Sequence, residues 1–323
     1  MKTRPALSAL AALALTVVLS SCSVDGGTTS AADDEPGSLT VGTLRAQPHL
    51  YTPHFYQQFA PEGTDVEIVL FDTSTDIKNA VVSGSIDVGV TGAASVIAGV
   101  SQGEGVTIVA SSADGGTRIV ADPAIATVED LRGATVGYPM GATQEILLKR
   151  TLEAQGLDPE SDVELVNLPF SDMAAALGSG QVDAFISAEV GPSIAIDAGA
   201  HELVSAYDTP IQRTNIVLAV ATDLVESDPE RVQEIVDMHV AATELMADDP
   251  QVWADGLVET FSLEPSVVAT AIENIWPRWE LDADWVAGLQ AMNEEMAAFG
   301  QTSQEADPEA LVDTTFVDAS DEG

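Results

Sequence analysis

The sequence predicts an α/β protein of two lobes, each built on a mostly parallel sheet flanked by helices. The main observation is an internal repeat. Segments 39–42, 66–70 and 76–88 recur in the same order 95 to 97 positions later, as 134–137, 163–167 and 172–184. Each copy has the pattern of a β-α-β-α-β unit, so we expect two units of one design. Such sheets bind ligands at the carboxyl ends of their strands, and two of these edges facing each other make a cleft.

The longest repeated segment indicates that the two copies fold alike. Gly84 and Gly180 each follow a serine at the end of an expected helix, where glycine can adopt the positive φ that ends a helix. Asp87 and Asp183 follow these glycines at the same spacing. Both copies therefore predict a short helix, a Ser-Gly turn and a buried strand.

The connections between the repeats predict a hinge. The apolar run 106–110 is the last expected strand of the first copy, and 111–116 is a turn-rich crossing. A second apolar run at 215–221 carries the chain back, and two crossings permit rigid-body closure. The expected lobes are 38–112 plus 214–323 for lobe one and 113–213 for lobe two.

The rest of the chain, from Asp228 to Phe299, has apolar residues at helical spacing and predicts a run of helices. All four tryptophans lie there, and we expect them to pack in the core rather than to stack on a ligand. They are Trp253, Trp276, Trp279 and Trp285.

The charge of the chain excludes several classes of partner. Eleven Lys and Arg residues stand against 52 Asp and Glu residues, which gives a formal net charge of −41. Such a protein repels nucleic acid and anionic membrane surfaces, so we expect no nucleic-acid partner. Because the carboxylates are spread along the whole chain, we interpret them as an adaptation of solubility, for which a high-salt habitat is one explanation.

The N-terminus predicts export and lipid anchoring. A basic start at 1–4 precedes an apolar stretch at 6–19 that is too short to span a bilayer comfortably. The stretch ends in Leu-Ser-Ser-Cys at 19–22, which resembles the lipobox of bacterial lipoproteins, and Cys22 is the only cysteine. We therefore expect a lipoprotein signal peptide at 1–21, a flexible tether at 22–37, and an extracytoplasmic protein anchored to the cell membrane by a lipid on Cys22.

Three motifs carry a resemblance to a known family. They are SGSIDVGVTG at 83–92, DLRGATVG at 130–137 and QVDAF at 181–185. In this order they resemble the nitrate/sulfonate/taurine-type solute-binding proteins of ABC importers, over about residues 39 to 300. The resemblance implies the two-lobed type II periplasmic-binding-protein fold and a monomer that closes over a small anionic or zwitterionic solute. It also implies ABC permease and ATPase subunits as partners, and no cofactor.

The expected binding site lies where helices follow strands. Free backbone N–H groups and the helix dipole attract anionic groups there, at 92–95 in lobe one and at 140–143 in lobe two. Gly141 lets a ligand approach the backbone, and Thr143 is either a helix cap or a ligand contact. The residues expected around the solute are Arg45, His49, Tyr51, Thr73, Ser74, Gly92, Ala93, Ala94, Met140, Gly141, Ala142, Thr143 and Glu189.

Several of these residues have a structural alternative. The loop 44–56 contains Arg45, His49 and Tyr51 near the end of the first strand, where each can either face the ligand or pack. The hydroxyl groups of 73–75 can cap the next helix or bind a solute. Glu189 would repel an anion but suits an amine-bearing solute, such as a taurine-like zwitterion or a pyrimidine. The class of solute therefore stays open.

Two other functions compete with solute import. An enzyme of the same fold could act on a pyrimidine precursor, and a solute sensor could bind without transport. The chain has no P-loop or H-E-x-x-H motif, and its four histidines lack the spacing of metal ligands. We therefore expect no catalytic residue and no metal.

Overall fold

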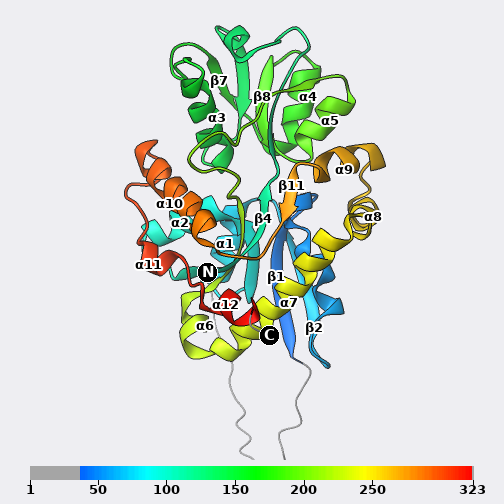
Figure 1. Ribbon diagram of the computed structural model, residues 1–323, viewed down its shortest axis with the longest axis vertical. Helices are drawn as coiled ribbons and strands as arrows, with labels where there is room; N and C mark the ends of the chain where they lie inside the picture. The colour runs from blue at the N-terminus through cyan, green and yellow to red at the C-terminus, as the bar shows by residue number, and fades with distance from the viewer. Residues whose placement is uncertain (1–36, 322–323) are drawn as a thin grey trace, which may run out of the picture. The chain divides into compact units, whose positions relative to one another are not determined.

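The computed structural model describes residues 37–321, in which eleven strands form two separate sheets (Figure 1). The expected signal peptide, Cys22 and all but the last residue of the expected tether lie outside these residues. Along the part of the chain that is described, no helix combines the length and the apolar character needed to cross a membrane.

The first sheet has six strands in the order β11-β4-β10-β3-β1-β2. They are β1 (Ser38–Leu44), β2 (Asp65–Phe71), β3 (Val88–Gly92), β4 (Val106–Gly115), β10 (Ile216–Ala221) and β11 (Ile275–Pro277). Strand β1 pairs in parallel with β2 and β3, whereas β10 is antiparallel to both β3 and β4. Strands β3, β4 and β10 are almost fully buried and rich in β-branched and small residues, as befits a central sheet covered on both faces.

The second sheet has five strands in the order β7-β6-β8-β5-β9. They are β5 (Thr117–Ala121), β6 (Thr135–Tyr138), β7 (Glu164–Asn167), β8 (Ala184–Ala188) and β9 (His201–Val204). Strand β6 is parallel to β7 and β8, and β5 is antiparallel to β8 and β9. The predicted two-lobed α/β fold is confirmed, with one difference. Each sheet is mixed, because β10 and β5 enter their sheets from the other lobe and run against the parallel strands.

Helices cover both sheets, and five of them lie in the repeated units. They are α1 (Ser74–Val82), α2 (Ala93–Ser101), α3 (Thr143–Ala154), α4 (Met173–Gly178) and α5 (Gly191–Asp197). Thr73 caps α1, because its side chain accepts a hydrogen bond from the Asp76 N–H at 3.1 Å. Short 3-10 helices at Pro48–Leu50 and Thr52–Gln58 fill the loop after β1.

The C-terminal part of the chain is helical, as predicted. Its helices are α6 (Thr222–Ser227), α7 (Pro229–Asp248), α8 (Pro250–Phe261), α9 (Pro265–Ile272), α10 (Ala283–Ala298), α11 (Pro308–Leu311) and α12 (Thr315–Asp321). Trp253 and Trp285 are buried in the core as expected. Trp276 corrects the prediction, because it is 37% exposed and the guanidinium of Arg213 lies 3.8 Å from its ring centre.

The internal repeat is confirmed by matching hydrogen bonds. The carboxylate of Asp87 accepts the N–H of Thr40 at 2.7 Å, and that of Asp183 accepts the N–H of Thr135 at 2.8 Å. The backbone N–H of each aspartate donates to the carbonyl of the same threonine, at 3.0 and 2.8 Å. Each aspartate thus ties the end of a helix-turn unit to the first strand of its own sheet.

The crossing between the sheets is shorter than the sequence predicts. Residues 111–115 continue strand β4 and are buried, because β10 and β11 both pair with them. The crossing itself is Gly116, between the last residue of β4 and the first of β5, and Gly115 and Gly116 have φ values of +78° and +73°. A side chain at Gly116 would meet the ring of His49, with its Cβ 3.0 Å from the ring. Glycine is therefore required at this position, because it adopts a positive φ without strain and leaves room for the ring of His49.

Candidate functional site

A cleft of about 480 Å³ lies between the strand ends of the two sheets. The loops after β1 and β2, the first turns of α1 and α2, and Asn215 line it from one side. The loop between β6 and α3, together with Phe170 and Ala188, lines it from the other. The cleft is therefore formed where the carboxyl ends of parallel strands meet, as such sheets favour.

Most of the predicted site residues come together in this cleft. Those that line it are His49, Thr73, Ser74, Gly92, Ala94, Met140, Gly141, Ala142 and Thr143. Arg45 lines an adjoining hollow at the mouth instead, where its side chain is 58% exposed and lies 3.6 Å from the carboxylate of Asp72. Tyr51, Ala93 and Glu189 are not among the residues that line the cleft.

Tyr51 packs in the core of lobe one, which corrects the prediction of a ligand contact. Its hydroxyl group bonds to Thr260 at 2.8 Å, and its ring stacks on His54 with 4.4 Å between ring centres. The 3-10 turns after β1 direct this side chain toward the distant helix α8, where Gly256 leaves room for it. Ala93 is also buried, and its N–H donates to the carbonyl of Asn215 at 2.8 Å.

Glu189 is fully buried in an internal ion pair, so the structure does not place it against a solute. Its carboxylate accepts hydrogen bonds from Arg118 Nε at 2.7 Å and from Ser193 Oγ at 2.7 Å. Burial raises the pKa of this carboxyl group, while the bonds from Ser193 and Arg118 oppose that change. Arg118 bonds in turn to Glu202 at 2.6 Å and to the carbonyl of Thr270 at 3.0 Å.

The start of helix α3 differs from its prediction in two ways. Thr143 is the first residue of the helix and not its cap, which is Ala142 and offers no side-chain bond. The N–H of Gly141 is not free, because it donates to the carboxylate of Glu145 at 2.7 Å. Sequence reasoning missed Glu145, although an acidic residue three places after the cap is a known signal at helix starts.

Helix α2 offers a more open N-terminus to the cleft. Its first residue is held by Asn215, but the backbone N–H groups of Ala94 and Ser95 have no acceptor among the described residues. Ser95 Oγ donates to the carbonyl of Gly92 at 2.7 Å and so rigidifies this turn. The first turn of a helix of this length favours a negatively charged group.

Neutral polar groups form the floor of the cleft. His49 is only 3% exposed, and burial lowers its pKa to about 3, so its imidazole is uncharged at physiological pH. His49 Nδ1 and Gln47 Oε1 are buried without a hydrogen-bond partner in the described structure. Unpaired buried polar atoms in a cleft are groups that a ligand can satisfy. Sequence reasoning missed Gln47, which no motif singles out.

Charged residues are sparse around the cleft. Among its described lining residues there is no lysine or arginine, and the acidic ones are Asp72 and Asp76. Asp76 is itself engaged with the Thr73 hydroxyl at 2.7 Å. Within residues 37–321, no group of three or more His, Cys, Asp or Glu side chains is arranged to hold a metal ion. The site is thus suited to binding through hydrogen bonds and helix dipoles.

Known proteins resemble this chain in sequence and in fold. The taurine-binding periplasmic protein of Escherichia coli (strain K12) is 28% identical over 202 residues, which cover 60% of this chain and 62% of that protein. The chain thus matches less than two thirds of this relative's length. The alkanesulfonate-binding protein SsuA of Xanthomonas axonopodis pv. citri superposes with a TM-score of 0.73 at 22% identity, over 87% of this chain and 99% of that one.

An enzyme shares the fold as well. The desulfurization enzyme DSZB superposes with a TM-score of 0.64 at 19% identity, over 88% of this chain and 99% of that one. A family model described as NMT1/THI5 like matches residues 56–252, which include most of both sheets and the residues of the cleft from Asp72 to Ile216. This chain belongs to the NMT1/THI5-like family.

Proposed function

We propose that this protein is the solute-binding component of an ABC importer and captures a small molecule in the cleft by closure of its two lobes. The observation that carries the proposal is the cleft itself, which both lobes line at their strand ends and which contains buried polar atoms without partners. The likeness to taurine- and alkanesulfonate-binding proteins supports it. ABC permease and ATPase subunits would be its partners.

The groups around the cleft favour a zwitterionic solute. The open N-terminus of α2 supplies N–H groups for an anionic end. The unpaired carbonyl oxygen of Gln47 and the carboxylate of Asp72 would accept hydrogen bonds from an amino end. A bare anion such as nitrate would meet no lysine or arginine among the described lining residues, so it would depend on helix dipoles and on neutral hydrogen-bond donors.

The same proposal includes the export of the protein and its anchoring to the cell membrane. A signal peptide at 1–21 would direct export, and a lipid on Cys22 would hold the protein outside the cell membrane through a tether at 22–37. The folded monomer would then divide at Gly116 instead of at 112–113, into lobe one, 38–115 plus 214–323, and lobe two, 117–213. The single cysteine at the end of an apolar stretch supports this arrangement.

We propose that the protein binds its solute without converting it, and not that it is an enzyme. The only histidine that lines the described cleft is His49, and burial lowers its pKa to about 3, which makes it a poor general base near neutral pH. The rival reading is tested by incubating the protein with each candidate solute and following the solute by mass spectrometry. Recovery of the unchanged solute supports a binding protein, and turnover of any solute overturns the proposal.

A binding screen tests the proposal directly. Melting temperature and calorimetry are measured with taurine, alkanesulfonates, nitrate and a pyrimidine, at low and high salt. A solute at a hundredfold excess over its Kd stabilises the folded state by about 2.7 kcal/mol. We expect taurine-like zwitterions to give the largest shift. His49→Ala should abolish the shift, while His201→Ala, in strand β9 away from the cleft, should keep it. Equal loss in both variants would contradict the assigned cleft.

A further inference from the structure

Lobe two is held to the C-terminal helices along two flanks, which Figure 1 shows as α9 next to α5 and α10 next to α3. At the α10 flank, Arg150 Nε donates to the carboxylate of Glu295 at 2.8 Å. Thr143 Oγ1 lies 3.8 Å from the sulfur of Met292. Side chains alone make these contacts, and each joins helix α3 of the second sheet to helix α10.

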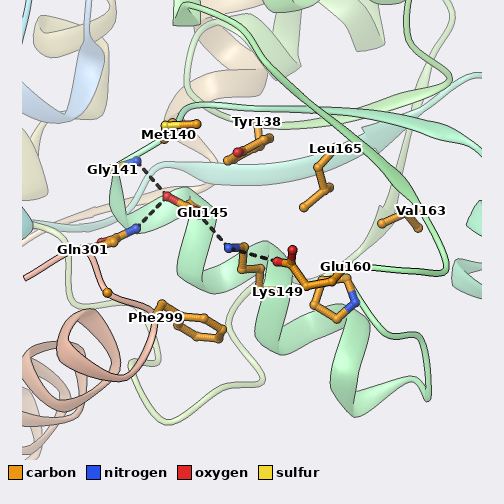
Figure 2. A pocket seen from close by; sticks show the side chains of 12 residues that line it. Tyr138, Met140, Gly141, Glu145, Lys149, Glu160, Val163, Leu165, Phe299 and Gln301 are labelled. Atoms are coloured by element: carbon orange, nitrogen blue, oxygen red, sulfur yellow. Dashed lines mark hydrogen bonds and ion pairs between the residues drawn. The ribbon is translucent and has the colours of Figure 1, made fainter.

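The carboxylate of Glu145 is the centre of this flank (Figure 2). One of its oxygens accepts the N–H of Gly141 at 2.7 Å and the side-chain amide of Gln301 at 2.8 Å. Its other oxygen lies 3.0 Å from the ammonium of Lys149. A single oxygen therefore joins the loop that lines the cleft to the segment that follows α10.

The contacts at the α10 flank lie next to a cavity and are partly exposed to solvent. A cavity of about 570 Å³ is lined by Met140 and Gly141 on one side and by Phe299 and Gln301 on the other, and Met140 and Gly141 also line the cleft. The side chain of Arg150 is 32% exposed, and that of its partner Glu295 is 13% exposed. Partly exposed ion pairs are weak, so contacts of this kind can form and separate without disrupting the core.

We propose that the α10 flank is a latch for the closed lobes, in which Gln301 and Glu295 hold helix α3 when the cleft shuts and release it when the cleft opens. The latch rests on the proposed closure of the lobes but not on the identity of the solute. Because Gly141 and Gln301 share one carboxylate oxygen of Glu145, movement of the cleft loop changes the latch directly.

Pulsed electron spin resonance on the full chain, without any solute, tests the latch. Replacing Cys22 by Ser leaves only introduced labels, at the exposed positions Glu62→Cys in lobe one and Gln155→Cys in lobe two. The double variant Gln301→Ala/Glu295→Ala should raise the ratio of open to closed distances about threefold to fivefold, the effect expected of weak polar contacts.

The matched control is Gln304→Ala. Gln304 follows in the same segment, but its amide donates to the carbonyl of Ser101 in α2 at 2.9 Å and does not reach lobe two. This variant should keep the wild-type distances. An unchanged distribution in the latch variant, or an equal change in the control, overturns the proposal.

A charge exchange provides a second test. Arg150→Glu and Glu295→Arg should each favour the open distance, and the two together should restore the closed one, because the pair is re-formed with opposite polarity. Failure of the double exchange to restore closure also overturns the latch. Circular dichroism shows that each variant is folded. Since no solute is present, the failure of every solute to bind would leave these results intact and would affect only the proposed function.

Discussion

The two flanks of lobe two use polar contacts of different kinds. At the α9 flank, Arg118 is 12% exposed and holds fully buried Glu189, while also bonding to the carbonyl of Thr270 near the end of α9. At the α10 flank, Arg150 is 32% exposed and meets Glu295, which is 13% exposed. The buried pair within lobe two fixes Arg118 in the position where it contacts α9, whereas the pair at the α10 flank itself spans the flank and is partly exposed. The difference therefore indicates a fixed flank and a releasable one.

The largest expected effect is at the fixed flank. Replacing Arg118 by Met leaves the carboxylate of Glu189 buried without its charge partner, which typically costs about 3–5 kcal/mol. Denaturant unfolding of the variant should show this loss. The double variant Arg118→Met/Glu189→Gln should recover most of it, because no buried charge remains. A loss below about 1 kcal/mol in the single variant would mean that the two flanks are alike.

The second-largest effect on the free energy of unfolding should come from lowering the pH, through two buried histidines. Burial lowers the pKa of His49 to about 3 and that of His239 to about 4, from an ordinary 6.5. The unfolded chain therefore takes up protons below about pH 6.5 that the folded protein does not. Stability is full above that pH and falls by about 1.4 kcal/mol per pH unit for each histidine as the pH drops toward those values.

His49 lies against the crossing and His239 against strand β4, and neither lies at the latch. His49 packs on Gly116, and His239 Nε2 lies 2.7 Å from the carbonyl of Ser111. Denaturant unfolding between pH 7 and 5 should therefore show a smaller slope in His49→Gln than in the wild type. The raised pKa of Glu189 changes stability with pH in the opposite sense in both proteins. The quantity to compare is therefore the difference in slope between His49→Gln and the wild type. Identical slopes would contradict the burial of His49 as a neutral ring.

A smaller effect is expected from the crossing glycine. In Gly116→Ala the backbone of the alanine must keep a positive φ, which costs about 1–2 kcal/mol. Its methyl group would also lie 3.0 Å from the ring of His49. Gly133→Ala is the matched control, because Gly133 has a φ of +80° but no atom within 4 Å of the added carbon. Unfolding by denaturant should show the larger loss for Gly116. Equal losses would mean that contact with His49 has no influence on the crossing.

The smallest effect on stability is expected at the latch. Arg150→Ala should lower the free energy of unfolding by at most about 1 kcal/mol, because the pair is partly exposed. High salt should reduce even that difference, since screening weakens exposed pairs most. A loss as large as that of Arg118→Met would show that this flank is fixed as well, and it would remove the contrast between the flanks.

The repeat was the part of the fold that the sequence predicted best. Gly84 and Gly180 end helices through their own positive φ, which is a local property. Asp87 and Asp183 bind equivalent strands because the two units repeat the same fold. The crossing was less predictable. Residues 111–115 read as a turn from their small and polar composition, but two partner strands from distant parts of the chain extend β4 through them.

The candidate site also contains residues that the sequence located and residues that it did not. Residues near helix starts, such as Gly92 and Met140, line the cleft as expected of their position, because a strand-helix junction fixes where they lie, and their contact with a solute stays a prediction. Glu189 and Tyr51 were not, because their environments depend on Arg118 and on helix α8, which are remote in sequence. Sequence spacing locates a residue at a sheet edge but does not show which neighbour its side chain meets.

The sequence by itself therefore determined the two α/β units, their shared turns and the ends of strands that form the cleft, since periodicity and glycine conformation act locally. Only the tertiary structure decided that Glu189 is neutralised inside lobe two, that Gln47 and His49 form an uncharged floor, and that Glu145 joins the cleft loop to Gln301. These features arise from side chains far apart in the chain, whose burial and charge pairing exist only after folding brings them together.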